Sequence, residues 1–273
     1  MPRLVIEAGR TEKHYWADLW RFRELFFILA WRDVAVRYKQ TVAGILWALL
    51  QPLLTMIIFT EIFGRVAKMP TEGGAPYPLL VLAGMLPWQF FAASLSGSSQ
   101  SLVGNANLIS KVYFPRMIIP AGAVITAFVD FLISFVILIG MMIWYQFWPS
   151  FRLLTLPLFV TIAFLGALGP GLLLTALTVK YRDFRFVIPF IVQFGLYVSP
   201  VGFSSTVFYS KWRLLYSLNP MVGVIDGFRW AILDGGTAFY LPGFLISCSV
   251  AILMLVAGIF YFRRTERTFA DVI

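Results

Sequence analysis

Residues 43–63 read AGILWALLQPLLTMIIFTEIF, and the only charged side chain among them is Glu61, near the end of the run. A helix needs about 20 apolar residues to cross the hydrocarbon core of a bilayer, which is roughly 30 Å thick. This stretch therefore predicts a membrane-spanning helix, with Glu61 at the level of the lipid head groups.

Five further segments have the same apolar character, at residues 77–102, 117–144, 153–179, 186–208 and 241–262. Over the whole chain of 273 residues, 60% are apolar and 13% are charged, whereas soluble domains average about 45–50% and about 25%. The sequence thus predicts an all-α integral membrane protein. Six transmembrane helices would occupy residues 43–262, between an N-terminal segment of residues 1–42 and a tail of residues 263–273.

The distribution of charge predicts how these helices are oriented. Sixteen of the 22 Lys and Arg residues fall in segments 1–42, 103–116, 180–185 and 263–273, and six fall in segments 64–76, 145–152 and 209–240. Basic residues concentrate in cytoplasmic segments, so we expect both termini in the cytoplasm. The first 42 residues are basic and mixed in character, and we expect no cleavable signal peptide there. The basic residues that orient the helices also account for the net charge of +9, so this charge does not require a nucleic-acid partner.

The N-terminal segment predicts a helix of a different kind. Residues 16–31 (WADLWRFRELFFILAW) place Asp18, Arg21 and Glu24 on one helical face, with large apolar side chains elsewhere. This pattern is typical of an amphipathic helix that lies in the membrane interface.

Residues 221–233 (MVGVIDGFRWAIL) form an apolar run that is too short to cross a bilayer. The region from about 209 to 240 therefore predicts short re-entrant helices before the last span. An amphipathic helix lying on the surface is the alternative.

Asp130 is the one carboxylate deep inside a predicted span. A charge at that depth must face water or a partner, so Asp130 is a candidate gate residue. The alternative is a structural hydrogen bond to a neighbouring helix, for example to a serine of segment 77–102. The serines of that segment either pack against other helices or line a wet conduit.

The chain is rich in aromatic residues, with 27 Phe, 11 Tyr and 9 Trp. Some of them fit the aromatic belts that form at membrane interfaces. Others are candidates to line a conduit, because aromatic faces stack on sugar rings, although packing against lipid explains them equally well. These candidates are Trp47, Trp88, Phe90, Phe91, Phe194 and Tyr197.

Several classes of chemistry are excluded by what the sequence lacks. One cysteine and one histidine cannot supply a disulfide framework or a zinc site. The dipeptide Gly-Lys never occurs, so there is no phosphate-binding loop, and no zinc-protease or nucleophile-elbow motif is present either. A chain without these motifs can still bind or conduct, but it is a poor enzyme candidate, and we expect no metal or cofactor of its own. If it uses ATP for transport, another chain must hydrolyse the ATP.

An ordered set of short motifs resembles one known family. The motifs are RDVAVRYKQTVAGILW at 32–47, QPL at 51–53, AGMLPW at 83–88, NLISKVYFPR at 107–116, KYRD at 180–183, SPV at 199–201 and LNPM at 218–221. In this order they resemble the permeases of polysaccharide ABC exporters, which export O-antigen, capsule or teichoic acid chains.

The resemblance implies an assembly in the cell inner membrane. Two copies of the permease would pair around a central conduit, and each would bind a separate ATPase subunit that holds ATP and Mg²⁺. The substrate would be a glycan linked to undecaprenyl diphosphate, most simply an O-antigen in lipopolysaccharide biosynthesis.

The resemblance also assigns roles to individual residues. The segment 107–116 would contain the helix that couples to the ATPase, with Lys111, Tyr113, Phe114 and Arg116 in the contact. Arg32, Arg37 and Lys39 would meet the lipid diphosphate, although anchoring by the positive-inside rule explains these cations equally well.

Three other functions remain as alternatives. A related permease could export a lipid or a drug. An integral-membrane transferase would need clustered acids or a histidine at the membrane surface, which Asp130 and His14 do not supply. A self-contained channel would need a repeated filter or a ring of charges.

Overall fold

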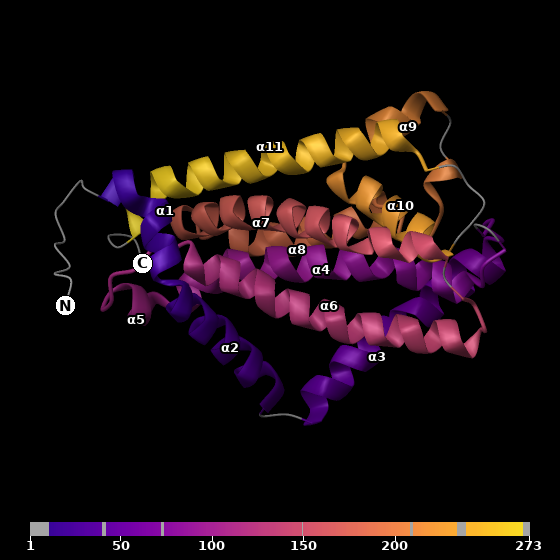
Figure 1. Cartoon of the computed structure of the whole chain (residues 1–273), viewed down its shortest axis with the longest axis horizontal. Helices are drawn as coiled ribbons and strands as arrows, with labels where there is room; N and C mark the ends of the chain where they lie inside the picture. The colour runs from indigo at the N-terminus through magenta and orange to yellow at the C-terminus, as the bar shows by residue number, and fades with distance from the viewer. Residues whose placement is uncertain are drawn as a thin grey trace.

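The computed structural model describes residues 11–39, 42–71, 74–148, 150–207, 210–233 and 239–269, and within these ranges the chain forms helices and no strand. The long helices lie side by side in one elongated bundle (Figure 1). We call its two ends the α5 end, where α1, α5 and the last turns of α11 gather, and the α10 end, where α9 and α10 lie.

The long helices run between these two ends, and the short helices lie at the ends (Figure 1). Their bounds are α1 Thr11–Arg21, α2 Arg23–Lys39, α3 Val42–Phe59, η1 Thr60–Val66, α4 Tyr77–Gly104, α5 Ala106–Ile109, α6 Ile118–Trp144, η2 Phe151–Thr155, α7 Leu156–Lys180, α8 Phe184–Val198, η3 Ser205–Val207, α9 Ser210–Tyr216, α10 Pro220–Leu233 and α11 Leu241–Glu266.

The central helix is α4, which packs against α6, α7 and α10. Its first half is apolar on every side, as expected of a helix that other helices surround, and most of its side chains are buried. Phe90 lies at the middle of this core, with its ring against those of Phe128 and Phe131 on α6 and Phe164 on α7.

The serine-rich second half of α4 is a packing surface. Ser94, Ser98 and Ser99 are buried. The Ser98 hydroxyl donates to the carbonyl of Pro120 on α6 at 3.1 Å, and the Thr175 hydroxyl on α7 donates back to the carbonyl of Ser98 at 2.7 Å. Small polar residues allow helices to approach closely and to bond across the contact. The packing alternative for these serines is therefore confirmed, and the conduit alternative is wrong for the buried ones.

A second close crossing joins α7 to α11 through two glycines. A Cβ atom at Gly258 would lie 2.1 Å from the carbonyl oxygen of Gly169, and a Cβ atom at Gly169 would lie 2.5 Å from the backbone of Leu255. The two backbones meet here without side chains between them, which brings α11 into close contact with α7.

Five stretches within the described ranges are long and apolar enough to cross a membrane. They are Leu49–Val66, Tyr77–Gly104, Ile118–Trp144, Phe151–Lys180 and Leu241–Glu266. These match the predicted spans 43–63, 77–102, 117–144, 153–179 and 241–262, and the all-helical membrane fold is confirmed to that extent.

The remaining predicted span, residues 186–208, is a helix only in its first half. Helix α8 has 15 residues and at 1.5 Å per residue is about 22 Å long, less than the roughly 30 Å of a hydrocarbon core. It ends because Ser199 adopts an extended conformation with φ −89° and ψ 151°, as the residue before Pro200 tends to do. The prediction that the helix continues from 199 to 207 is therefore wrong, because the chain turns there and forms only the short η3; residue 208 lies outside the described part of the chain.

The N-terminal helix is longer than predicted and runs along the bundle. α1 and α2 are separated only by a turn at Phe22. One side is buried, at Tyr15, Leu29 and Ala30, and the other carries exposed tryptophans. α2 packs against α6 and descends obliquely from the α5 end (Figure 1). The two-sided character predicted for residues 16–31 is therefore present, and the position of this helix in the membrane interface stays a prediction.

Candidate functional site

The segment between α4 and α6 projects at the α5 end of the bundle (Figure 1). α4 ends at Gly104, the single turn of α5 follows, and the backbone then leaves the helix until α6 begins at Ile118. Lys111, Val112 and Tyr113 are exposed along this projection. It therefore presents a cation and an aromatic ring beyond the ends of the long helices.

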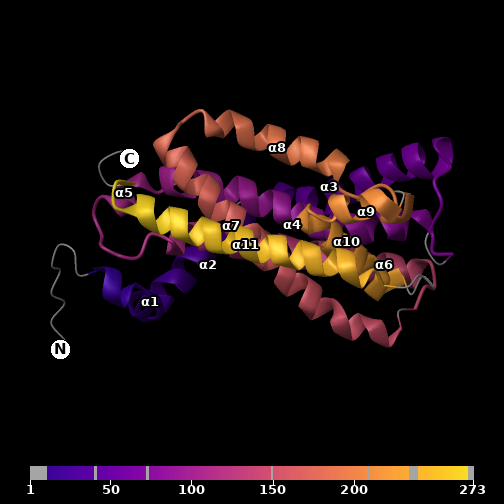
Figure 2. The same cartoon turned by 90° about the horizontal axis from the view of Figure 1, so that it is seen from above.

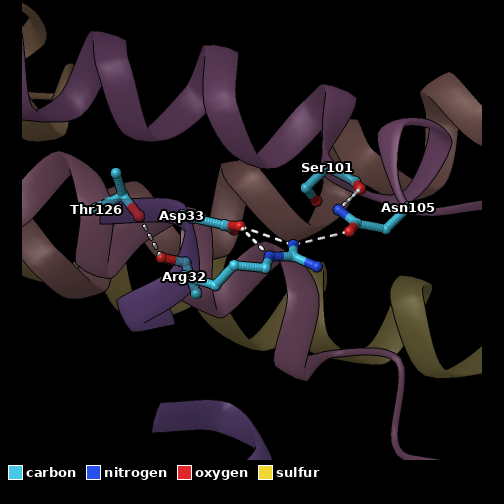
Figure 3. Close-up of polar contacts among 6 residues, drawn as sticks. Arg32, Asp33, Ser101, Asn105 and Thr126 are labelled. Atoms are coloured by element: carbon cyan, nitrogen blue, oxygen red, sulfur yellow. Dashed lines mark hydrogen bonds and ion pairs between the residues drawn. The ribbon is translucent and has the colours of Figure 1, made fainter. Parts of the chain in front are cut away.

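A polar anchor holds the base of the projection, as Figure 3 shows. The Arg32 guanidinium on α2 donates to the Asp33 carboxylate at 2.7 Å and to the side-chain oxygen of Asn105 at 2.9 Å. The Asn105 amide in turn donates to the carbonyl of Ser101 at 2.9 Å, in the last turn of α4. Arg32 thus ties α2 to the point where α4 ends.

Phe114 and its neighbour Tyr113 have opposite surroundings. Phe114 is 4% exposed and lies in an apolar cluster with Leu102, Ile109 and Met117, whereas Tyr113 is 44% exposed. Phe114 anchors the projection to the chain's own core, so its predicted place in an ATPase contact is not supported by its burial. The exposed members of the predicted contact are Lys111 and Tyr113.

Arg116, the fourth member of that predicted contact, holds the end of α11. Its backbone N–H donates to the Glu266 carboxylate at 2.7 Å, and its guanidinium donates to the backbone carbonyl of Glu266. Tyr15 of α1 lies near Glu266, and burial together with the Glu266 charge raises the pKa of the Tyr15 hydroxyl. These contacts join α1, the projection and α11 into one unit.

A cavity of about 1040 Å³ opens between these three elements. Its basic lining residues are Lys111, Arg116, Arg263, Arg264 and Arg267, and its acidic ones are Asp18 and Glu266. The Arg263 guanidinium lies over the ring of Tyr15, 4.7 Å from its centroid, and 5.8 Å from that of Trp16. The cavity is therefore basic, with aromatic rings in its wall.

Asp130 is paired with α2. Its carboxylate accepts an ion pair from Arg37 at 2.8 Å and a hydrogen bond from the Tyr38 hydroxyl. The alternative of a structural bond to a neighbouring helix is thus supported, but the expected serine partner is wrong.

This pair also places the end of α2 at depth. Asp130 lies 12 residues beyond the start of α6 at Ile118, or about 18 Å along the helix. Arg37 reaches this point, whereas the sequence predicted it at the membrane face. Arg32 and Arg37 bond to carboxylates of the chain itself, and the side chain of Lys39 lies outside the described residues. The structure does not gather these three cations, and their phosphate role stays a prediction.

The predicted conduit aromatics separate into two groups. Trp88 and Phe90 are buried in the core and Phe91 is partly buried there, whereas Phe194 and Tyr197 are exposed on α8. Trp88 packs against Gly195, where an added Cβ would lie 2.6 Å from the ring. Trp88 and Phe90 are therefore packing residues. Trp47 lies on α3, but its side chain is outside the described part of the chain.

At the α10 end, Arg229 of α10 is completely enclosed. Its side chain is 0% exposed, and its guanidinium donates to three backbone carbonyls, those of Leu80 at 3.2 Å, Val201 at 2.8 Å and Phe203 at 2.6 Å. The last two belong to the turn that follows α8, where the broken helix leaves carbonyls without helical partners. Arg229 satisfies them and links α10, α4 and this turn.

Other polar contacts hold the same turn. The Tyr77 hydroxyl donates to the carbonyl of Gly202 at 2.5 Å, and the Asn219 amide donates to the Ser199 hydroxyl at 2.9 Å. The Ser205 hydroxyl donates to Asp226 of α10 at 2.5 Å. Nearly every residue of α10 is buried, so the alternative of a helix lying on the surface is wrong for residues 221–233.

Arg229 is the residue that the sequence analysis missed, because it was counted among the charges of an external loop. The available signal was a lone cation in the middle of an apolar run, since such a charge inside a membrane protein needs specific partners. Among the described residues, no three His, Cys, Asp or Glu side chains gather in a way that would hold a metal ion.

Comparison with known proteins places this chain in a family. The pattern of the ABC-2 type transporter family matches residues 24–233. The O-antigen export system permease protein RfbA of Myxococcus xanthus is 27% identical over 252 residues, covering 91% of this chain and 96% of its own. The protein of the same name from Klebsiella pneumoniae is 26% identical over 92% and 95% of the two chains.

A relative of lower identity is named for a different cargo. The polysialic acid transport protein KpsM of Escherichia coli is 22% identical over 209 residues, covering 75% of this chain and 79% of its own. The family pattern spans most of the chain and includes α2, the projection and α10. The chain therefore belongs to the ABC-2 type transporter family.

Proposed function

We propose that the chain is the membrane subunit of an ATP-driven exporter that moves a lipid-linked polysaccharide, of the O-antigen class, across the cytoplasmic membrane. The observation that carries this proposal is the similarity to O-antigen export permeases along more than nine-tenths of both chains. A likeness of that extent includes both ends of the bundle, and with them the projection and the α10 region.

ATP would be hydrolysed by a separate subunit that docks at the α5 end. The projection supports this part of the proposal, because Val112 and Tyr113 are exposed on it while Phe114 and Arg116 fix it to the bundle. A rigid base lets a displacement at the tip reach α1 and α11 together. The α5 end would then face the cytoplasm, in agreement with the basic residues that gather there.

Two copies would pair around the conduit. Helices α3 and α8 support this, because both carry rows of exposed apolar residues, among them Leu50, Leu54, Phe190 and Phe194. α8 lies along one flank of the bundle, on the side away from α6 (Figure 2). A conduit between copies would place Phe194 and Tyr197 against the glycan, and α9 and α10 would be short re-entrant helices closing it at the far side.

The test is a deletion strain complemented by the gene. We expect that the deletion abolishes surface polysaccharide and accumulates the lipid-linked polymer inside the cell, and that the intact gene reverses both effects. Purification of the tagged chain should recover an ATPase subunit. Normal surface polysaccharide in the deletion strain would overturn the assignment, and accumulation of a lipid or drug instead would favour the alternative of a related permease.

A further inference from the structure

The cavity at the α5 end changes character along α11. Val256, Ile259 and Phe260 line its inner part, and Arg263, Arg264 and Arg267 follow towards the end of the helix. From Val256 to Arg264 the helix rises about 12 Å. An apolar wall thus gives way to a cationic one over the distance that separates the upper acyl chain of a lipid from its phosphate.

The rest of the lining comes from the projection and α1. Lys111 of the projection and Trp16 of α1 line the same cavity, and the Arg263 guanidinium lies 5.8 Å from the centroid of the Trp16 ring. Trp16 is 56% exposed on α1, as tryptophans are at the boundary between acyl chains and head groups. The cavity therefore lies at the level where lipid head groups begin.

The two acidic residues in the wall, Asp18 and Glu266, do not cancel its positive character, because they are outnumbered by five basic ones: Lys111, Arg116, Arg263, Arg264 and Arg267. The Glu266 carboxylate accepts a hydrogen bond from the backbone N–H of Arg116, and its backbone carbonyl accepts one from the Arg116 guanidinium, so this acid is held within the chain. Lys111 and Arg264 are exposed and line the cavity, so their charges are available to a ligand that enters it.

We infer that this cavity binds an anionic phospholipid of the surrounding bilayer, with the phosphate between Lys111 and Arg264 and an acyl chain along Val256 and Phe260. Val256 and Phe260 are 60% and 68% exposed on a helix long enough to cross the membrane. A soluble protein could meet the cations, but it could not reach this apolar wall, so a lipid fits the whole lining. The inference does not depend on which solute is exported.

The experiment uses the full-length chain purified in a neutral detergent. Phosphatidylglycerol or phosphatidylcholine is added, and bound lipid is counted by native mass spectrometry alongside the thermal unfolding midpoint. We expect phosphatidylglycerol to be retained and to raise the midpoint, and phosphatidylcholine to do neither. Because each basic residue near an anionic lipid surface contributes about 1 kcal/mol, Lys111→Gln with Arg264→Gln should weaken retention by roughly tenfold or more.

The matched control removes two other exposed cations from the same end, by Arg182→Gln with Arg185→Gln, and should leave retention unchanged. Phe260→Ser should weaken retention without any change of charge. The inference is overturned if both double variants lose lipid equally, or if glycerol 3-phosphate displaces phosphatidylglycerol as well as the lipid itself does. It is also overturned if Lys111→Gln with Arg264→Gln releases the ATPase subunit but keeps the lipid.

Discussion

The two ends of the bundle use arginine in opposite ways. At the α10 end, Arg229 is fully enclosed and donates to three backbone carbonyls from two separate elements. At the α5 end, Arg264 and Lys111 stand exposed in the wall of an open basic cavity. The first arrangement fixes the positions of helices and turns, and the second leaves charge available for something outside the chain.

This difference follows from the backbone at each end. The turn after α8 has left its helix within a buried region, so its carbonyls need donors from the protein, because an unpaired buried carbonyl costs free energy. The long helices at the α5 end finish near exposed polar residues, where water can complete their hydrogen bonds. Stability should therefore depend strongly on the cation at the α10 end and weakly on those at the α5 end.

The largest expected effect comes from Arg229→Met. The variant leaves buried carbonyls without a donor, and we expect the free energy of unfolding to fall by about 3 kcal/mol or more. Arg229→Lys should recover part of the loss, because an ammonium group can reach fewer of the carbonyls. Size-exclusion chromatography and thermal unfolding of the chain in detergent measure both changes.

Arg264→Met is the matched control at the α5 end, and in neutral detergent without added anionic lipid its unfolding midpoint should stay close to that of the unaltered chain. If Arg229→Met and Arg264→Met unfolded at the same temperature, the contrast between the two ends would be wrong.

A smaller effect is expected from a methyl group placed against the same arginine. In Gly84→Ala the added Cβ would lie 2.8 Å from a terminal nitrogen of Arg229 and 3.2 Å from Ile225. Such crowding in a packed core costs about 1–3 kcal/mol, and thermal unfolding in detergent should register it. Gly97→Ala, also on α4, meets Ala123 at an ordinary 3.6 Å and should unfold no earlier than the unaltered chain. Equal losses for both variants would mean that helix geometry, and not Arg229, sets the cost.

Much of the fold was predictable from the sequence, because apolar runs of about 20 residues predict membrane-spanning helices. Five of the predicted spans match helices of sufficient length, and the helix at residues 221–233 was expected from its apolar run. The end of α8 at Ser199 was not foreseen, although Pro200 was visible, because many prolines lie inside helices here, among them Pro52, Pro87 and Pro170.

The sites were harder to predict, because partners far apart in sequence decide the role of a side chain. Asp130 stood out by its depth, but its partners lie 92 and 93 positions earlier, on a helix expected elsewhere. Phe114 and Tyr113 look alike in sequence, and only the packing of α6 and α11 separates the buried ring from the exposed one. Arg229 could not be distinguished from a loop cation by sequence, because its role depends on the carbonyls of the turn after α8, to which it donates.

The Arg37–Asp130 pair lies between the two extremes, with side chains 53% and 18% exposed. Arg37→Gln leaves the Asp130 carboxylate without its cation in an apolar setting. We therefore expect the free energy of unfolding to fall by about 1 kcal/mol, and assembly and export to be reduced. Exchanging the two residues, by Arg37→Asp with Asp130→Arg, should restore part of the loss. A double-mutant cycle on unfolding midpoints measures this coupling, and Tyr38→Phe controls for the neighbouring hydroxyl. An exchange no better than the single variants would mean that the pair contributes nothing.

The smallest effect on stability is expected at the tip of the projection, where the effect on assembly should be large. Partial burial and the charges of Asp18 and Glu266 raise the pKa of Tyr113, so its hydroxyl stays protonated and can donate to an acidic partner. Tyr113→Ala should change the free energy of unfolding by less than about 0.5 kcal/mol. Because Tyr113 is an exposed aromatic residue at the proposed interface, Tyr113→Ala should nonetheless weaken recovery of the ATPase subunit by roughly tenfold or more.

Phe114→Ala is the matched variant. It should lower the unfolding midpoint, because the Phe114 ring supports the core. If Tyr113→Ala kept the ATPase bound while lowering the midpoint, the exposed face of the α5 end would be structural, like the enclosed arginine at the other end.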